Sequence, residues 1–128
     1  MSSLYTEIIT DAYRYPRHRG GLPDATHSHE EDNPLCGDQL RVHLRVQEGV
    51  VTEAKFEGQG CAISQAAAEL ILEGIQGQPV SAVREITKDT VLEELGLPSI
   101  SPARLKCALL CLSALRGALD LNPGNVPQ

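Results

Sequence analysis

The positions of apolar residues predict a helix followed by a β-hairpin in the first half of the chain. Apolar side chains recur at helical spacing over residues 3–14, and Pro16 ends this helix because the residue before a proline is pushed out of the helical region. Apolar and polar residues alternate over 40–46 and again over 50–57, which is typical of strands with one buried face. Glu48 and Gly49 lie between these stretches and predict the turn of the hairpin.

The other segments predict a loop and four further helices. Residues 17–38 are rich in turn-forming residues, and we expect them to form a loop. Residues 62–75 are rich in Ala and Leu and predict a long helix, while shorter helices are expected over 80–86 and 89–95. Residues 101–119 begin with Ser-Pro, which is typical of a helix start, and predict a last helix. Helices combined with an antiparallel hairpin, without alternating strand–helix units, indicate an α+β fold.

Length, composition and charge narrow the class of protein. The chain has 128 residues, of which 41% are hydrophobic and 22% charged, so we expect residues 1–128 to form a single domain with its own core. The net charge of −6 and the aromatic content of 3% argue against a nucleic-acid partner, because phosphates need clustered Lys and Arg and bases stack on aromatic rings. No apolar run approaches the ~18 residues of a membrane span, and the N-terminal residues do not resemble a secretory signal. We therefore expect a cytoplasmic protein without a membrane partner.

The residues best suited to chemistry are four cysteines, namely Cys36, Cys61, Cys107 and Cys111. In a reducing compartment such cysteines are more often metal ligands, nucleophiles or buried packing residues than disulfides. Cys36 and Asp38 are two residues apart, so in an extended backbone their side chains project to the same side and could share one ion. The glycine between them makes this turn flexible, and Cys36 is therefore the best candidate for a nucleophile toward sulfur.

Two of the other cysteines also lie where a thiolate is favoured. Cys61 precedes the expected helix over 62–75, where free backbone N–H groups and the helix dipole stabilise an anion. Cys107 follows Lys106, and a positive neighbour has the same effect. Together with Cys36 and Asp38 these residues would supply four ligands for tetrahedral zinc. The same thiols could instead hold the irons of an iron–sulfur cluster, and buried structural cysteine is the alternative for each of them.

Cys111 lies one helical turn after Cys107, next to the edge of the expected apolar stripe of the last helix. That stripe is expected to run through Leu105, Leu109, Leu112, Leu115 and Leu119. Because an unpaired cysteine is among the most frequently buried residue types, we interpret Cys111 as a packing residue.

The histidines and a basic cluster give weaker indications. His27 and His29 lie in the expected loop, where such histidines are more often solvated than bound to metal. A basic cluster follows the first helix and consists of Arg14, Arg17, His18 and Arg19. We interpret this cluster as a solvated face, with a docking patch for an acidic partner as the alternative.

Four motifs make the chain recognisable beyond these physical arguments. LYTEIITDAYRYPRHRGGL, NPLCGDQLRV, AKFEGQGCAIS and PARLKCALL, in this order, resemble the SufU branch of the IscU/NifU N-terminal family of iron–sulfur cluster assembly proteins. The resemblance covers nearly the whole chain and implies an α+β fold in which a small antiparallel sheet packs against several helices, with a metal site at one end.

The resemblance also implies roles for individual residues. Cys36, Asp38, Cys61 and Cys107 fall on the ligand positions of the family, whereas Cys111 does not. In SufU-like proteins, the cysteine at the position of Cys36 accepts persulfide sulfur from a cysteine desulfurase of the SufS type.

Two features relate the chain to different branches of this family. The IscU branch has a histidine directly before the third ligand cysteine, whereas this chain has Lys106 there, as in SufU. SufU-like proteins commonly carry an insertion between the second and third cysteines, and the segment 62–106 is closer in length to that of IscU.

The leading prediction is therefore a zinc-dependent sulfur acceptor, or sulfurtransferase, that takes sulfur onto Cys36 from a desulfurase and passes it to downstream cluster assembly proteins. The alternative is a non-enzymatic scaffold on which a [2Fe–2S] cluster is assembled from iron and then transferred, with Asp38 keeping the cluster labile. A third hypothesis is a zinc module with a purely structural role, although a 128-residue domain has less need of metal to fold than a small zinc finger.

Overall fold

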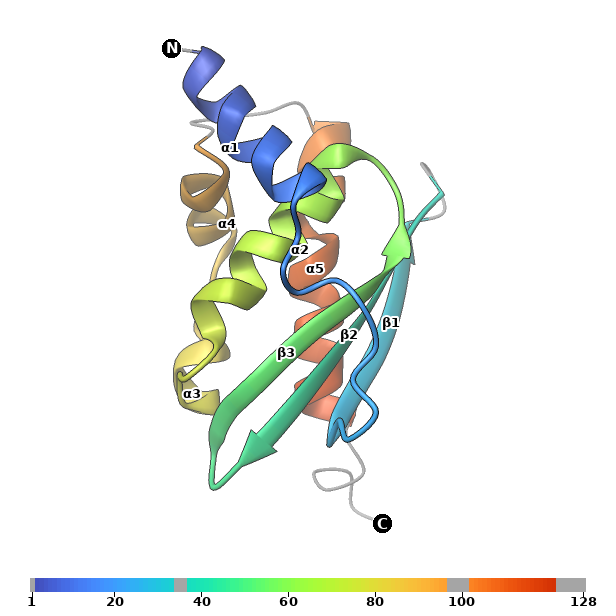
Figure 1. Ribbon diagram of the computed structural model, residues 1–128, viewed down its shortest axis with the longest axis vertical. Helices are drawn as coiled ribbons and strands as arrows, with labels where there is room; N and C mark the ends of the chain where they lie inside the picture. The colour runs from blue at the N-terminus through green and yellow to red at the C-terminus, as the bar shows by residue number, and fades with distance from the viewer. Residues whose placement is uncertain (1, 34–36, 97–101, 122–128) are drawn as a thin grey trace.

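A three-stranded antiparallel sheet lies against a set of helices in the computed structural model, which describes residues 2–33, 37–96 and 102–121 (Figure 1). In chain order the elements are α1 (Ser2–Arg14), β1 (His27–Asn33), β2 (Asp38–Gln47), β3 (Val50–Gln59), α2 (Ala62–Ile75), α3 (Val80–Val83), α4 (Lys88–Leu95) and α5 (Pro102–Leu121). The prediction of an α+β fold is confirmed. The expected positions of all the helices are also confirmed, with small differences at their ends.

The predicted hairpin forms the centre and one edge of the sheet. The strand order is β1-β2-β3, and β2 pairs with β3 in antiparallel register from Gln39 opposite Gln59 to Gln47 opposite Val50. Glu48 (φ 53°) and Gly49 (φ 78°) form the turn in left-handed conformations. Two successive residues with positive φ match the right-handed twist of the flanking strands, which is why glycine is favoured at such a turn.

Strand β1 corrects the expectation that residues 17–38 form a loop. It pairs antiparallel with β2 from His27 opposite Leu44 to Asn33 opposite Asp38. Its sequence, HSHEEDN, has no aliphatic or aromatic hydrocarbon side chain, so the hydrophobic pattern gives no sign of a strand. The strand forms because it satisfies the free edge of β2 and lies under helix α5.

The helices are gathered on one side of the sheet (Figure 1). Helix α5 contacts β1 and β2, and α2 contacts β3 and α5. Helices α1 and α4 pack against α2 and complete the outer layer. Among the described residues, no helix is long and apolar enough to cross a membrane.

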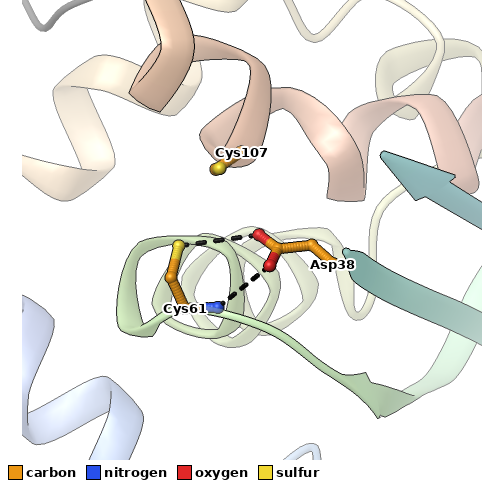
Figure 2. Close-up of side chains that lie close together, drawn as sticks. All are labelled: Asp38, Cys61 and Cys107. Atoms are coloured by element: carbon orange, nitrogen blue, oxygen red, sulfur yellow. Dashed lines mark hydrogen bonds between the residues drawn. The ribbon is translucent and has the colours of Figure 1, made fainter. Parts of the chain in front are cut away.

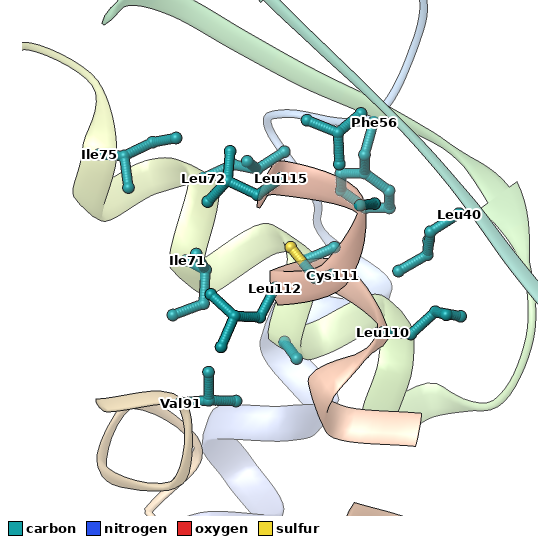
Figure 3. Packing of buried hydrophobic residues seen from close by; sticks show 14 of the residues in the cluster. Leu40, Phe56, Ile71, Leu72, Ile75, Val91, Leu110, Cys111, Leu112 and Leu115 are labelled. Carbon is teal, nitrogen blue, oxygen red and sulfur yellow. The ribbon is translucent and has the colours of Figure 1, made fainter. Parts of the chain in front are cut away.

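The core lies between the sheet and these helices, with Leu40 and Phe56 of the sheet facing side chains of α2, α4 and α5 (Figure 3). Leu105 and Leu109 of the expected α5 stripe are only partly buried, whereas Leu110 is buried. The expected single stripe is wrong in this respect because α5 packs against the sheet on one side and against α2 and α4 on the other.

Cys111 occupies the centre of this core (Figure 3). Its side chain is only 1% exposed, and burial raises the pKa of its thiol to about 12. The interpretation of Cys111 as a packing residue is confirmed.

Candidate metal centre

Three of the four expected ligands converge at the end of the sheet where β2 begins and β3 ends (Figure 2). One carboxylate oxygen of Asp38 and the sulfur atoms of Cys61 and Cys107 all lie within 4.8 Å of one another. The fourth expected ligand, Cys36, lies outside the described residues. The sequence thus brings together ligands that are separated by up to 69 positions along the chain, from Asp38 to Cys107.

Each ligand is mounted on a different regular element. Asp38 is the first residue of β2, opposite Asn33 of β1. Cys61 is the N-cap of α2 and follows β3 after a single glycine, in the extended conformation expected of that position. Cys107 lies in the second turn of α5, which crosses above the other two (Figure 2). A site held by a strand and two helices has little freedom to change its geometry.

Two hydrogen bonds connect Cys61 to Asp38. The backbone N–H of Cys61 donates to Asp38 Oδ1 at 3.2 Å, and the Cys61 thiol donates to Asp38 Oδ2 at 3.6 Å. The first bond satisfies one of the backbone N–H groups that lack a partner within α2. The side chain of Cys61 makes no capping hydrogen bond to these groups. Asp38 is only 3% exposed, so these bonds also compensate for the burial of its carboxylate.

Gly60 allows this close approach. A Cβ atom at position 60 would lie 2.7 Å from Asp38 Oδ1 and 2.8 Å from the hydroxyl oxygen of Ser64. Real Cβ atoms essentially never approach heavy atoms this closely, so the arrangement of Asp38 depends on a residue without a side chain.

Ser64 is a neighbour of the site that the sequence interpretation did not single out. It is fully buried, its hydroxyl donates to the backbone carbonyl of Cys61 at 3.0 Å, and its oxygen lies 4.0 Å from Cys61 Sγ. The signal that could have identified it is its spacing, because a residue three positions after an N-cap returns to the same end of the helix.

The three ligands differ in exposure. Asp38 and Cys107 are buried, the latter at 7%, whereas Cys61 is exposed. The centre therefore has a closed floor and one accessible side. Two sulfur donors and one carboxylate suit zinc or the iron of a cluster, and either would need a further ligand to reach four.

His27 and His18 are buried, contrary to expectation, whereas the arginines of the basic cluster are exposed as expected. His27 and His29 lie on β1 and, within the described residues, belong to no group of three ligands. His27 is buried, which corrects the expectation of a solvated loop histidine, and desolvation together with the charge of Arg84 lowers its pKa. In the basic cluster, Arg17 is indeed exposed, whereas His18 is buried.

Comparison with known proteins identifies the family of this chain. The profile of the family described as NifU-like N terminal domain matches residues 4–125. The chain is 37% identical to the iron-sulfur cluster assembly scaffold protein IscU of Thermotoga maritima, over 91% of this chain and 92% of that protein. It is 33% identical to the zinc-dependent sulfurtransferase SufU of Bacillus subtilis, over 98% of this chain and 96% of that protein.

A solved structure shows the same architecture. It is the crystal structure of an iron-sulfur cluster assembly scaffold protein for the SUF system from Fervidobacterium islandicum. The two structures superimpose with a TM-score of 0.76 at 26% sequence identity, and the superposition covers 91% of this chain and 97% of the other. With a family profile that spans almost the whole chain and two relatives above 30% identity, this protein belongs to the NifU-like N-terminal domain family.

Proposed function

We propose that this protein is a zinc-dependent sulfur acceptor in iron–sulfur cluster assembly. It takes persulfide sulfur onto Cys36 from a cysteine desulfurase of the SufS type and passes the sulfur to downstream cluster assembly proteins. The observation that carries this proposal is the convergence of Asp38, Cys61 and Cys107 in a chain whose B. subtilis relative is named a zinc-dependent sulfurtransferase. The reduced thiols that this chemistry requires persist in the cytoplasm, where we expect the protein to act.

The donor set fits zinc. Thiolate, thiolate and carboxylate are all zinc ligands, and Cys36 would complete a closed set of four. When bound, zinc keeps its thiol ligands deprotonated at neutral pH. The protein contributes the positions of these ligands, since Asp38 is held by the backbone N–H of Cys61 independently of the metal.

The sulfur-transfer step balances without an external oxidant or reductant. The thiolate of Cys36 attacks the outer sulfur of the desulfurase persulfide. The S–S bond to the desulfurase cysteine breaks, a new S–S bond forms on Cys36, and the desulfurase cysteine leaves as a thiolate. Meanwhile Asp38, Cys61 and Cys107 stay in place because each is held by a regular element of the fold.

Alanine formation by the cysteine desulfurase tests this proposal, because alanine is released each time the desulfurase removes sulfur from cysteine. The zinc-loaded, iron-free protein is expected to stimulate alanine formation, and Cys36→Ser is expected to abolish the stimulation. Cys111→Ala is the matched control, because Cys111 lies in the core and not among the ligands. Stimulation retained in Cys36→Ser, or absent from the wild-type protein, would contradict the proposal.

A second function is favoured by the relative that is named a scaffold and matches this chain at 37% identity. In that case the same ligands hold a [2Fe–2S] cluster before its transfer, and the oxygen ligand Asp38 makes the cluster labile. Anaerobic reconstitution with iron and sulfide distinguishes the two functions: Asp38→Ala is expected to give a more persistent coloured cluster than the wild type. If neither protein retains iron, the scaffold function is eliminated.

A further inference from the structure

A second group of ligand-type side chains lies outside the thiol centre. One ring nitrogen of His18 and one carboxylate oxygen from each of Glu69 and Glu73 all lie within 4.8 Å of one another. The two glutamates are one turn apart on α2, and His18 belongs to the segment between α1 and β1. His18 and Glu69 are buried at 8% and 3% exposure, while Glu73 lies at the surface.

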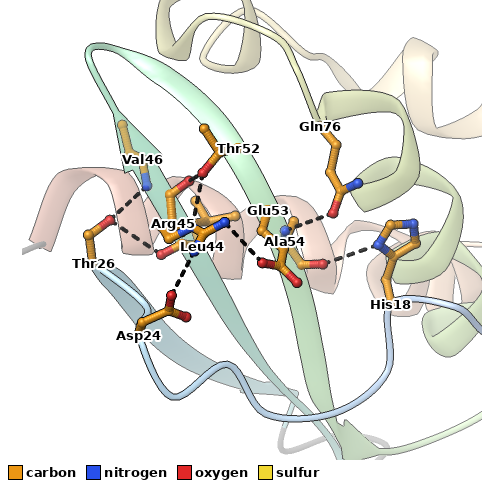
Figure 4. Close-up of polar contacts among 10 residues, drawn as sticks. All are labelled: His18, Asp24, Thr26, Leu44, Arg45, Val46, Thr52, Glu53, Ala54 and Gln76. Atoms are coloured by element: carbon orange, nitrogen blue, oxygen red, sulfur yellow. Dashed lines mark hydrogen bonds and ion pairs between the residues drawn. The ribbon is translucent and has the colours of Figure 1, made fainter.

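The buried members of this group are held in place by the backbone. The N–H groups of Arg17 and His18 each donate to a different carboxylate oxygen of Glu69, both at 2.9 Å. His18 Nδ1 lies 3.1 Å from the carbonyl oxygen of Ala54 (Figure 4). Because a carbonyl only accepts, Nδ1 carries a proton, and in the neutral ring the lone pair that can bind a metal ion is on Nε2. A histidine whose other nitrogen donates to a carbonyl, beside a carboxylate that accepts hydrogen bonds, is the usual outer arrangement of a metal ligand set.

The imidazole of His18 lies close to the carboxylates of Glu69 and Glu73 without bonding to them. Within the part of the chain that the structure describes, no hydrogen bond or ion pair joins the His18 ring to either glutamate. Glu69 accepts two backbone N–H groups and Glu73 pairs with Arg17, which leaves each carboxylate with further lone pairs. A cation can bind these lone pairs together with the imidazole of His18.

We propose that His18, Glu69 and Glu73 form a second divalent-cation site, separate from the thiol centre. One imidazole and two carboxylates are harder donors than thiolates, and they suit Mn²⁺, Fe²⁺ or Zn²⁺ with the remaining positions filled by water. Glu69 is eight residues after Cys61 on the same helix, which corresponds to about 12 Å of axial rise. The two centres are therefore too far apart to share one ion.

Arg17 competes with a cation for this site. Its guanidinium lies 3.5 Å from Glu73 Oε2, and its side chain is 77% exposed. An exposed ion pair of this kind is weak, so Arg17 can move into solvent when a divalent ion binds. Removing the positive charge should consequently strengthen cation binding, an effect that a purely structural role of the glutamates would not produce.

Titration with Mn²⁺ alone tests the proposal on protein loaded with a single equivalent of zinc and freed of excess zinc. The thiol centre is then filled, because thiolates favour zinc, and the second site is left for Mn²⁺. Electron paramagnetic resonance of free Mn²⁺ measures binding, and electron spin-echo modulation detects an imidazole nitrogen bound to the ion. We expect one Mn²⁺ per chain with imidazole modulation that is lost in His18→Gln. Glu73→Gln should weaken binding about tenfold or more, and Arg17→Gln should strengthen it severalfold.

Glu93→Gln is the matched control, because Glu93 is an exposed helical glutamate of α4 outside this group. Glu73 is itself at the surface, so its substitution is expected to leave the fold intact, which circular dichroism verifies. Absence of bound Mn²⁺, absence of imidazole modulation, or equal binding by the wild type and Glu73→Gln would each overturn the proposal. None of these outcomes depends on sulfur transfer at Cys36.

Discussion

Replacing Gly60 with alanine should weaken zinc binding at the thiol centre although none of the ligands is replaced. The added Cβ would lie 2.7 Å from both Cγ and Oδ1 of Asp38, whereas ordinary contacts begin at 3.4 Å. The carboxylate would have to retreat by about 0.7 Å, unless the backbone at position 60 moves instead. Metal–ligand distances tolerate only about 0.2 Å. The 3.2 Å hydrogen bond from the Cys61 N–H to Asp38 Oδ1 would be stretched or lost as well.

The expected cost follows from this displacement. Disturbing the groups that orient a ligand typically lowers metal affinity by about 10–100-fold, which corresponds to roughly 1.4–2.7 kcal/mol. Overpacking a buried position also destabilises a fold by about 1–3 kcal/mol. Zinc affinity and the free energy of unfolding of the zinc-free protein must therefore be measured separately.

Competition with a chromophoric chelator measures the zinc affinity, and urea unfolding in the presence of a chelator measures the stability. Gly74→Ala is the matched control, since a Cβ at position 74 meets no atom within 4 Å and the residue lies inside helix α2. Gly74→Ala should raise stability by about 0.5–1 kcal/mol and leave zinc affinity unchanged. If Gly60→Ala binds zinc as tightly as the wild type, the position of Asp38 does not depend on Gly60 and the expected clash is refuted.

Three further predictions concern packing, reactivity and pH. The Cβ added by Gly117→Ala would overlap the imidazole ring of His29, so this variant should be destabilised by about 1–3 kcal/mol in urea unfolding, and adding His29→Ala should restore most of that loss. No loss of stability in the single variant would contradict the packing. In the folded, zinc-free protein iodoacetamide should label the exposed Cys61, whereas Cys111 should react only on unfolding, because burial raises its pKa to about 12. Rapid labelling of Cys111 in the folded protein would contradict this. Burial lowers the pKa of His27 below 6.5, so the unfolded chain takes up a proton at a higher pH than the folded protein. The free energy of unfolding should therefore fall as the pH drops from 6.5 toward the pKa of the folded protein. Urea unfolding of His27→Gln should depend less on pH, and an unchanged dependence would refute this.

The helices and the hairpin were predictable because their burial follows the hydrophobic pattern. In β2 and β3 the buried and exposed positions alternate as the sequence does, with Leu40 and Val42 buried and Gln39 and Arg41 exposed. Strand β1 also alternates in burial, but the residues turned inward are polar. His27 is buried where a strand would ordinarily carry an aliphatic side chain, so only the pairing with β2 reveals the strand. Charged and polar residues on such an edge strand also discourage pairing with other chains.

The ligands of the thiol centre could be predicted because their chemistry is visible in the residue types. Asp38, Cys61 and Cys107 each stand next to a break or a charge in the sequence, and the family resemblance selected them together. The group of His18, Glu69 and Glu73 could not be predicted in this way. His18 stands among arginines, which suggested a solvated face, and it is buried because the segment after α1 is drawn against α2 by Glu69.

The three ligands that the structure describes give a last prediction about zinc. Asp38, Cys61 and Cys107 are held by three different regular elements, whereas Cys36 precedes β2. Loss of the Cys36 thiol therefore leaves three ligands held by the fold, and water or the introduced hydroxyl can complete the set. Loss of Cys61 or Cys107 removes a ligand from that fixed group. Zinc affinity should accordingly fall less in Cys36→Ser than in Cys61→Ser or Cys107→Ser when measured by chelator competition.

A sulfur acceptor also needs a Cys36 thiolate that can dissociate from zinc while the zinc stays bound. The thiol can then carry sulfur while the other ligands hold the metal. If Cys36→Ser loses zinc as completely as Cys107→Ser, Cys36 is an obligatory ligand and this separation of roles is wrong.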